Sequence, residues 1–258
     1  MKHITSKLLS LLLCLAMLMS MVPAAYAAGT EGTDVTEANG GATTDAAKVG
    51  ERGFPTLAAA LDNAQDGATV TLLADVTEDV TINKTITLDL GGKTLTNTST
   101  GKATISVNGG TVTVKSGAVQ GGTGYYNIEV TKGSNANLTL EGVTATAGNT
   151  GSSMIDNYGD LTINSGDYSG GLDTIKNEPN AKLTITGGTF TLEKGNSKGF
   201  TGVVFNYGEL NISGGTFIQN DTSAPYAQAQ VIHTDKSGSN APSTIICKAP
   251  ILLDIMVK

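Results

Sequence analysis

Four tyrosines stand in positions from which they could contact a sugar. Tyr158 and Tyr207 each complete the phrase Asn-Tyr-Gly, and Tyr125 and Tyr126 form a pair earlier in the chain. An exposed aromatic ring offers a flat apolar face and a polar hydroxyl, and several such rings along a groove can stack on sugar rings. The alternative is that these rings pack over a corner of the fold. We take the four tyrosines as candidate ligand-binding residues.

A set of asparagines has a structural explanation. They fall at equivalent places in successive repeats, namely Asn108, Asn157, Asn177 and Asn206. Asparagine tolerates a left-handed backbone, and its amide can hydrogen-bond to the equivalent amide of the next repeat. We expect a ladder of asparagines that holds the corners of the repeats together, rather than a ligand site.

Four aspartates lie close together in the sequence, at Asp156, Asp160, Asp167 and Asp173. Outward carboxylates on stacked repeats could bind Ca²⁺ weakly. The spacing of an EF-hand loop and the glycine-rich calcium-binding nonapeptide are both absent. We therefore predict no metal ligands and no cofactor beyond weak Ca²⁺ binding, and we interpret the aspartates as solvated acids that keep the protein soluble.

The composition favours an all-β protein. The chain has 258 residues with 33 glycines, no tryptophan, many threonines and 39% apolar residues, enough for a core. Threonine favours strands and glycine favours turns, so a helical bundle is excluded. The formal net charge of −7 argues against a nucleic-acid partner, because phosphate binding needs a basic face.

Residues 1–27 have the pattern of a secretory signal peptide. Lys2 and Lys7 precede a short apolar run, residues 8–21, and Ala25-Tyr26-Ala27 forms a cleavage motif. An uncleaved anchor is the alternative. Cleavage after Ala27 would leave 14 of the 16 basic residues against 23 acidic ones, a net charge of −9. We expect a secreted or cell-surface protein with no membrane span after cleavage.

A leader and one helix precede the main body of the chain. Residues 28–48 lack apolar periodicity and are rich in glycine, alanine, threonine and acids, so we expect a disordered acidic leader. Leu57, Leu61 and Ala64 then recur at helical spacing between Pro55 and Gly67, which suit a helix start and stop. This predicts one amphipathic helix over residues 55–66.

From residue 68 onward the chain consists of repeats. Each of the clearest copies, residues 153–168, 173–190 and 202–217, contains an apolar pair, an asparagine, a short turn, a strand and a glycine corner. Anchored on the first strand residue, the copies recur every 22–27 residues, at Ile86, Val112, Leu138, Leu161, Leu183 and Leu210. A leucine-rich frame is missing, and a propeller blade needs roughly 40–50 residues. The repeats predict a parallel β-solenoid over residues 49–246, with about seven coils stacked about 4.8 Å apart.

Alternation along each strand predicts which side chains enter the core. The leucines and isoleucines at the anchor positions and two residues later should point inward, and Phe190 and Phe217 should be buried at their glycine corners. One outward column is expected to contain Thr87, Thr113, Thr139, Thr162, Thr184 and Asn211.

Two stretches resemble a known family. FPTLAAALDNAQDGATVTLLADVTED at residues 54–79, followed by INKTITLDLGGKTLTN at 82–97, is similar to the opening of pectin-lyase-like right-handed parallel β-helix domains. The likeness is greatest to such domains in exported surface proteins of Firmicutes-type bacteria, and it covers residues 50–246. It implies that the helix caps the N-terminal end of the core. Members of this fold include polysaccharide lyases and hydrolases as well as adhesins and stalks, so the resemblance implies no single activity.

The residues that glycan cleavage requires in this family form no recognisable constellation here. Pectate-lyase chemistry needs a cationic base, but Arg52, the only arginine, precedes the predicted helix. Lys115, Lys176 or Lys182 could replace it, although none lies in a known pattern. Paired aspartates, a Gly-His-Gly segment and a nucleophile elbow are missing, and His233 lies near the end. We predict no catalytic residues.

We expect a non-enzymatic adhesin or stalk module that binds a glycan, or a host or neighbouring-cell surface, along the flank of the β-helix. The alternative is a polysaccharide lyase or glycoside hydrolase relative, active or decayed, that acts on acidic polysaccharide. A purely structural spacer is the third interpretation. Residues 247–258 depart from the repeat and are expected to form a cap or to mark a truncation.

Overall fold

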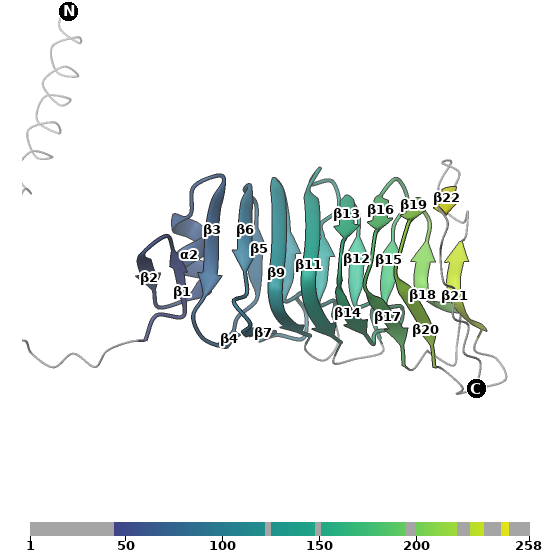
Figure 1. The fold of residues 1–258 in the computed structure, drawn as a ribbon, viewed down its shortest axis with the longest axis horizontal. Helices are drawn as coiled ribbons and strands as arrows, with labels where there is room; N and C mark the ends of the chain where they lie inside the picture. Colours follow the sequence, from purple (N-terminus) through teal and green to yellow (C-terminus); the bar gives the residue numbers. More distant parts are fainter. Residues whose placement is uncertain are drawn as a thin grey trace, which may run out of the picture. The chain divides into compact units, whose positions relative to one another are not determined.

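The described part of the chain folds into a parallel β-helix of about five turns and contains one short helix (Figure 1). The computed structural model describes residues 44–121, 125–147, 151–193, 200–220, 228–234 and 244–247. The fold class expected from the repeats is confirmed, and the architecture is consistent with a pectin-lyase-like β-helix. The turn count is lower than the seven coils expected. Residues 1–27, which are predicted to be a signal peptide, residues 28–43 and the tail after Cys247 lie outside the described residues.

Three ladders of parallel strands form the sides of the β-helix. The first ladder contains β3 (Ala68–Leu72), β6 (Ile86–Asp89), β9 (Thr111–Gln120), β11 (Asn137–Thr146), β13 (Asp160–Ile163), β16 (Lys182–Ile185), β19 (Glu209–Ile212) and β22 (Thr244–Cys247). The second ladder contains β4 (Val76–Thr77), β7 (Thr94–Thr96), the later halves of β9 and β11, β14 (Gly166–Ser169), β17 (Thr189–Leu192) and β20 (Thr216–Gln219). The third ladder contains β5 (Val80–Ile82), β8 (Ile105–Val107), β10 (Ile128–Val130), β12 (Ile155–Asn157), β15 (Ile175–Asn177), β18 (Phe200–Asn206) and β21 (Gln228–Thr234).

The core is filled by stacked columns of like residues. Leu161 pairs with Leu183, which pairs with Leu210, and all three are buried. The threonine column lies in register from Thr87 to Thr184 and ends at Asn211, on the outward side as expected. Alternation therefore assigns inside and outside correctly along the first ladder.

At the second ladder the core contains a stack of three aromatic rings. The rings of Tyr168, Phe190 and Phe217 are buried, and neighbouring centroids are 5.1 Å apart at interplanar angles of 8° and 13°. Gly188, with φ of +106°, makes the corner before Phe190, and a Cβ there would lie 3.3 Å from that ring. Glycine is therefore required at this corner by both backbone conformation and space.

The N-terminal end is closed by a hairpin and a helix. β1 (Ala47–Val49) pairs antiparallel with both β2 (Arg52–Phe54) and β3, so regular structure begins at Ala47, two residues before the expected boundary. Helix α2 spans Leu57–Asn63, which is shorter than the predicted 55–66. The chain is already extended at Ala64, and the helix begins only after the N-cap Thr56, so Pro55 lies outside it. No helix among the described residues is long and apolar enough to cross a membrane.

Both ends of α2 are held by side chains from the first coil. The Glu78 carboxylate accepts hydrogen bonds from the backbone N–H groups of Leu57 and Ala58, each at 2.9 Å. The Lys84 ammonium donates to the carbonyl oxygens of Leu61 and Ala64, each at 3.0 Å. An acid at the start of a helix and a base at its end satisfy groups that the short helix leaves open.

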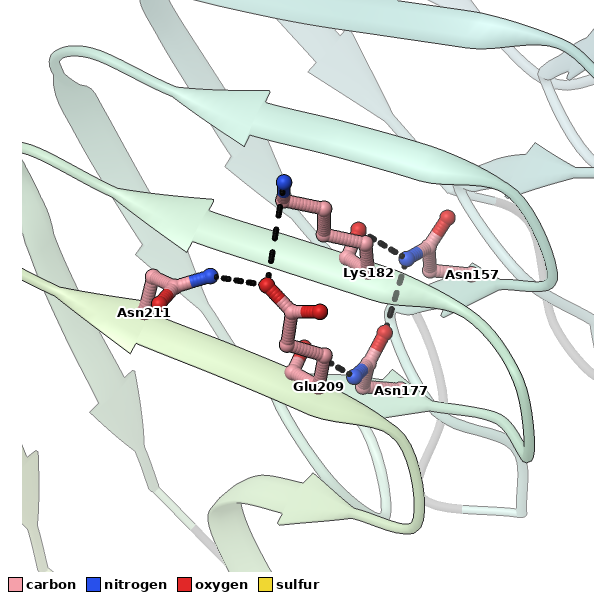
Figure 2. A network of polar contacts seen from close by, with 5 residues as sticks. All are labelled: Asn157, Asn177, Lys182, Glu209 and Asn211. Carbon is pink, nitrogen blue, oxygen red and sulfur yellow. Dashed lines mark hydrogen bonds and ion pairs between the residues drawn. The ribbon is translucent and has the colours of Figure 1, made fainter. Parts of the chain in front are cut away.

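Three of the four predicted asparagines form a continuous ladder inside the β-helix, and Figure 2 shows two of them, Asn157 and Asn177. The Asn157 amide donates to Asn177 Oδ1 at 2.8 Å, and the Asn177 amide donates to Asn206 Oδ1 at 2.7 Å. All three side chains are fully buried at the last residue of β12, β15 and β18. The same amides also donate to the carbonyl oxygens of Lys182 and Glu209 at 3.0 Å, which joins the third ladder to the first.

Asn108 does not belong to this ladder. The residue in register with Asn157 is Val130, and the one before that is Val107, so Asn108 lies one position beyond the ladder column. Its side chain is exposed, and its Oδ1 accepts a hydrogen bond from the Thr131 hydroxyl at 2.8 Å. The prediction for Asn108 was wrong because a shift of one residue moves a side chain from the inside to the outside of the strand end.

We expect Asn177→Ala to lower the free energy of unfolding by about 3 kcal/mol, because it removes the buried side-chain hydrogen bonds to Asn157, to Asn206 and to the Glu209 carbonyl. Asn211→Ala is the matched control: Asn211 is partly exposed and bonds only at the surface, to Glu209 at 2.7 Å (Figure 2). The control should change stability by no more than about 0.5 kcal/mol. Urea unfolding of both variants measures the difference, and equal losses would contradict a role for the ladder.

Candidate functional site

The outer face of the third ladder carries a row of side chains unlike those of the other faces. The next-to-last residue of each strand in this ladder points away from the core, and the register places these residues side by side. In order along the ladder they are Thr81, Ser106, Glu129, Asp156, Lys176, Phe205 and His233. Two carboxylates, an ammonium and two aromatic rings thus lie on consecutive strands, and we call them the outer row.

A surface pocket of about 300 Å³ opens beside the outer row. Its aromatic lining comes from Tyr126, before β10, and from Phe205 and Tyr207, at the end of β18 and just beyond it. Lys176 of β15 and Asp173, which precedes that strand, supply the charged groups. The remaining lining residues are Gly151, Ser152, Ser153 and Leu172. The volume lies at the lower end of the roughly 300–1,000 Å³ typical of small-molecule sites.

All four predicted tyrosines lie at or near this pocket. Tyr126 and Tyr207 line it, and the ring of Tyr125 packs against Tyr126 with centroids 4.5 Å apart. Tyr158 is beside the pocket, where the Lys132 ammonium lies 5.8 Å from its ring centroid. The fold therefore gathers residues separated by up to 82 positions in the sequence (125 to 207) onto one face.

Lys176, which lines the pocket, forms an ion pair with Glu178, the residue just after the end of the same strand. Lys176 Nζ lies 2.5 Å from Glu178 Oε1, and the Glu178 side chain is only 9% exposed. Burial acts to lower the pKa of Lys176, but the ion pair with Glu178, assisted by Asp156, raises it overall. Lys176 also lies 5.9 Å from the centroid of Tyr207. Its ammonium is therefore fixed against the aromatic wall and remains charged.

Asp156 is the fully buried acid of the outer row. Its side chain is fully buried, and neither carboxylate oxygen has a well-formed hydrogen bond among the described residues, although the Tyr126 hydroxyl is close enough to act as a weak donor. Burial, followed by the charge of Glu178, raises the pKa of Asp156 to about 7, and Lys176 opposes that rise. Burial, together with the charges of Asp156 and Glu178, also raises the pKa of Tyr158 to about 12.

Asp173 is buried as well, but it is supported by hydrogen bonds. It accepts from the backbone N–H of Gly202 at 2.9 Å and from the Ser153 hydroxyl at 3.2 Å. Burial raises the pKa of Asp173 to about 6, although these donors and Lys176 lower it. Two acids that change charge close to neutral pH therefore lie beside one aromatic pocket, a feature enriched at functional sites.

The other candidates for chemistry lie elsewhere. Lys115 pairs with Asp89 at 3.5 Å and Lys182 with Glu209 at 3.7 Å, both on the first ladder, and Arg52 lies over the Phe54 ring. Asp160 and Asp167 are exposed on β13 and β14, away from the buried Asp156 and Asp173. Within the described part of the chain, no three acidic, histidine or cysteine side chains are placed to hold a metal ion.

Sequence reasoning missed Phe205, Glu178 and the role of Asp156 in the site. The repeat does contain a signal for them. Aligning the ladder asparagines puts Asp156, Lys176 and Phe205 in one column immediately before them. Because neighbours along a strand face opposite sides, a buried asparagine predicts an outward residue before it.

Comparison with protein-family models, with curated proteins and with solved structures finds no match for this chain. The assignment of the site therefore depends on the geometry of the chain's own residues.

The pKa of Asp156 predicts a pH-dependent stability. An ordinary aspartate has a pKa of 3.8, whereas folded Asp156 loses its proton only at about 7. Between these values the folded protein holds a proton that the unfolded chain has lost, so the free energy of unfolding falls as pH rises through this window. Glu178, Glu129, Lys176 and Tyr126 face the same carboxyl and set the size of the effect.

Asp156→Asn should remove this part of the pH dependence. We expect the variant to be more stable than the parent by about 3 kcal/mol at pH near 8, and by much less at pH near 5. Thermal unfolding at the two pH values measures this, with Asp167→Asn, at an exposed aspartate, as the control. An Asp156→Asn variant with the parent's pH profile would show that Asp156 is ionised in the folded protein.

Proposed function

We propose that this protein is a secreted or cell-surface β-helix module that binds a glycan on its flank without cleaving it. The pocket beside the outer row supports the proposal, because it combines three aromatic rings with a lysine and a buried aspartate. Aromatic faces stack on the apolar faces of sugar rings, while a few fixed polar groups select hydroxyl positions. A host or neighbouring-cell surface that displays the glycan would be the partner.

The sequence supports the location. Residues 1–27 have the n-region, apolar run and cleavage motif of a secretory signal peptide. The resemblance to pectin-lyase-like domains of exported surface proteins of Firmicutes-type bacteria belongs to the same proposal. The proposal also includes an adhesin or stalk role, in which a rigid stack of coils holds the pocket at a distance from the cell. The partner is not a nucleic acid, since the chain has a net charge of −7.

A second candidate function is cleavage of a polysaccharide. Asp156 and Asp173 favour it, because carboxyls with pKa values of about 7 and about 6 are suited to general acid chemistry near neutral pH. Fully buried Asp156 does not line the pocket, however, and Asp173 is already engaged by two protein donors. Incubation with polysaccharides and analysis for unsaturated or newly reducing ends separates the two functions.

Tyr126→Ala and Tyr207→Ala should each weaken glycan binding by about tenfold or more, because each removes one wall of the pocket. A glycan array selects the ligand, and calorimetry measures the affinity. Leu73→Ala is the control, since Leu73 is an exposed apolar side chain outside the pocket. Unchanged affinity in the Tyr126→Ala/Tyr207→Ala double variant would rule out this pocket as the binding site.

A further inference from the structure

The charges around the pocket are balanced in an unusual way. Lys176 is the cation in the lining, and the carboxyls of Asp173, Asp156 and Glu178 surround it. Glu178 does not line the pocket, but its carboxylate oxygen Oε1 lies 2.5 Å from Lys176 Nζ. The positive charge that faces the pocket is therefore already countered by a fixed and nearly buried acid.

An acidic ligand would bind poorly in this setting. A uronate or sialate carboxylate would have to compete with Glu178 for Lys176, and it would approach the carboxyl of Asp173 in the lining. Because Lys176 is already paired with Glu178, a second carboxylate would gain little from the lysine and would be repelled by the acids around it. The pocket has hydrogen-bond donors that an acidic sugar could use, but it lacks the net positive charge that would attract one.

A cationic ligand is also disfavoured. The Lys176 ammonium is held against the Tyr207 ring, at 5.9 Å from its centroid, so it occupies the aromatic face that would attract a second cation. Asp173 already accepts hydrogen bonds from Gly202 and Ser153. The pocket therefore offers an ammonium that can donate, a carboxyl with further lone pairs that can accept, and aromatic walls. These groups match the hydroxyls and apolar face of an uncharged ring.

We propose, on the basis of the proposed glycan-binding function, that the pocket takes an uncharged pyranose and that Glu178 is the specificity-determining residue that keeps acidic sugars out. Glu178 acts through Lys176 and need not touch the ligand. The proposal separates this protein from an enzyme or binder of acidic polysaccharide.

The test compares the wild-type protein with Glu178→Gln on neutral and on uronate-containing oligosaccharides of equal length. Wild type should bind the neutral set, and bind the uronate set at least about tenfold more weakly. Glu178→Gln should gain about tenfold or more for the uronate set, because it releases the Lys176 charge, and should change the neutral set by no more than about threefold. The gained binding should weaken with added salt, as an interaction with a released charge does.

Two further variants control the assignment. Glu209→Gln releases Lys182 from an ion pair on the first ladder, away from the pocket, and should give no gain for acidic sugars. Adding Lys176→Met to Glu178→Gln should abolish the gain. Thermal unfolding of each variant establishes that it is folded, and the wild-type comparison tests the proposal without any substitution.

The outcomes are distinct. A wild-type protein that prefers uronates or amino sugars retains a glycan-binding function but overturns the selectivity proposed here. A folded Glu178→Gln protein with no gain for uronates overturns the role of Glu178. Absence of binding to every glycan class, in wild type and variant alike, overturns the proposed function itself and this inference with it.

Discussion

Strands of the three ladders hydrogen-bond in register to the matching strands of the next repeat, and this pairing is the constraint on which the rest of the structure depends. It places equivalent residues on top of one another at the strand spacing of about 4.8 Å. Leucine stacks on leucine, asparagine on asparagine, and an aromatic ring on an aromatic ring. Such columns are favourable for apolar and amide side chains, because each member repeats the same good contact.

The same constraint is unfavourable for charges, since identical acids in register would repel. The first ladder avoids this by alternation: Asp160, Lys182 and Glu209 follow one another in a column, and Lys182 lies 3.7 Å from Glu209. On the third ladder the repeat varies instead, and the column passes from Glu129 through Asp156 and Lys176 to Phe205. This variation concentrates dissimilar groups on one face, which distinguishes that face from the regular ones.

The irregular third ladder includes a destabilising residue, and the regular hydrogen-bonded columns offset that loss of stability. Asp156 is buried with no well-formed hydrogen bond, which destabilises its charged form, whereas the neighbouring asparagine column is fully bonded. Proteins that follow consistent rules elsewhere commonly violate them at functional positions. Here the exception is the buried Asp156. It lies beside the aromatic pocket and two residues before Tyr158, so the unusual acid and the candidate site occupy the same place in the fold.

The fold class, the inward and outward columns of the first ladder and three members of the asparagine ladder can be predicted from the amino-acid pattern, because a repeat of period 22–27 leaves few ways to bury its apolar residues. The pattern also points to the four tyrosines. It does not give the ladder position of Asn108, the short extent of α2 or the residues that surround those tyrosines. The ion pair of Lys176 with Glu178 and the burial of Asp156 depend on which strands become neighbours and on what covers them, so they become visible only in the folded chain. Local patterns record periodicity, whereas charge balance and burial belong to contacts between residues far apart in the chain.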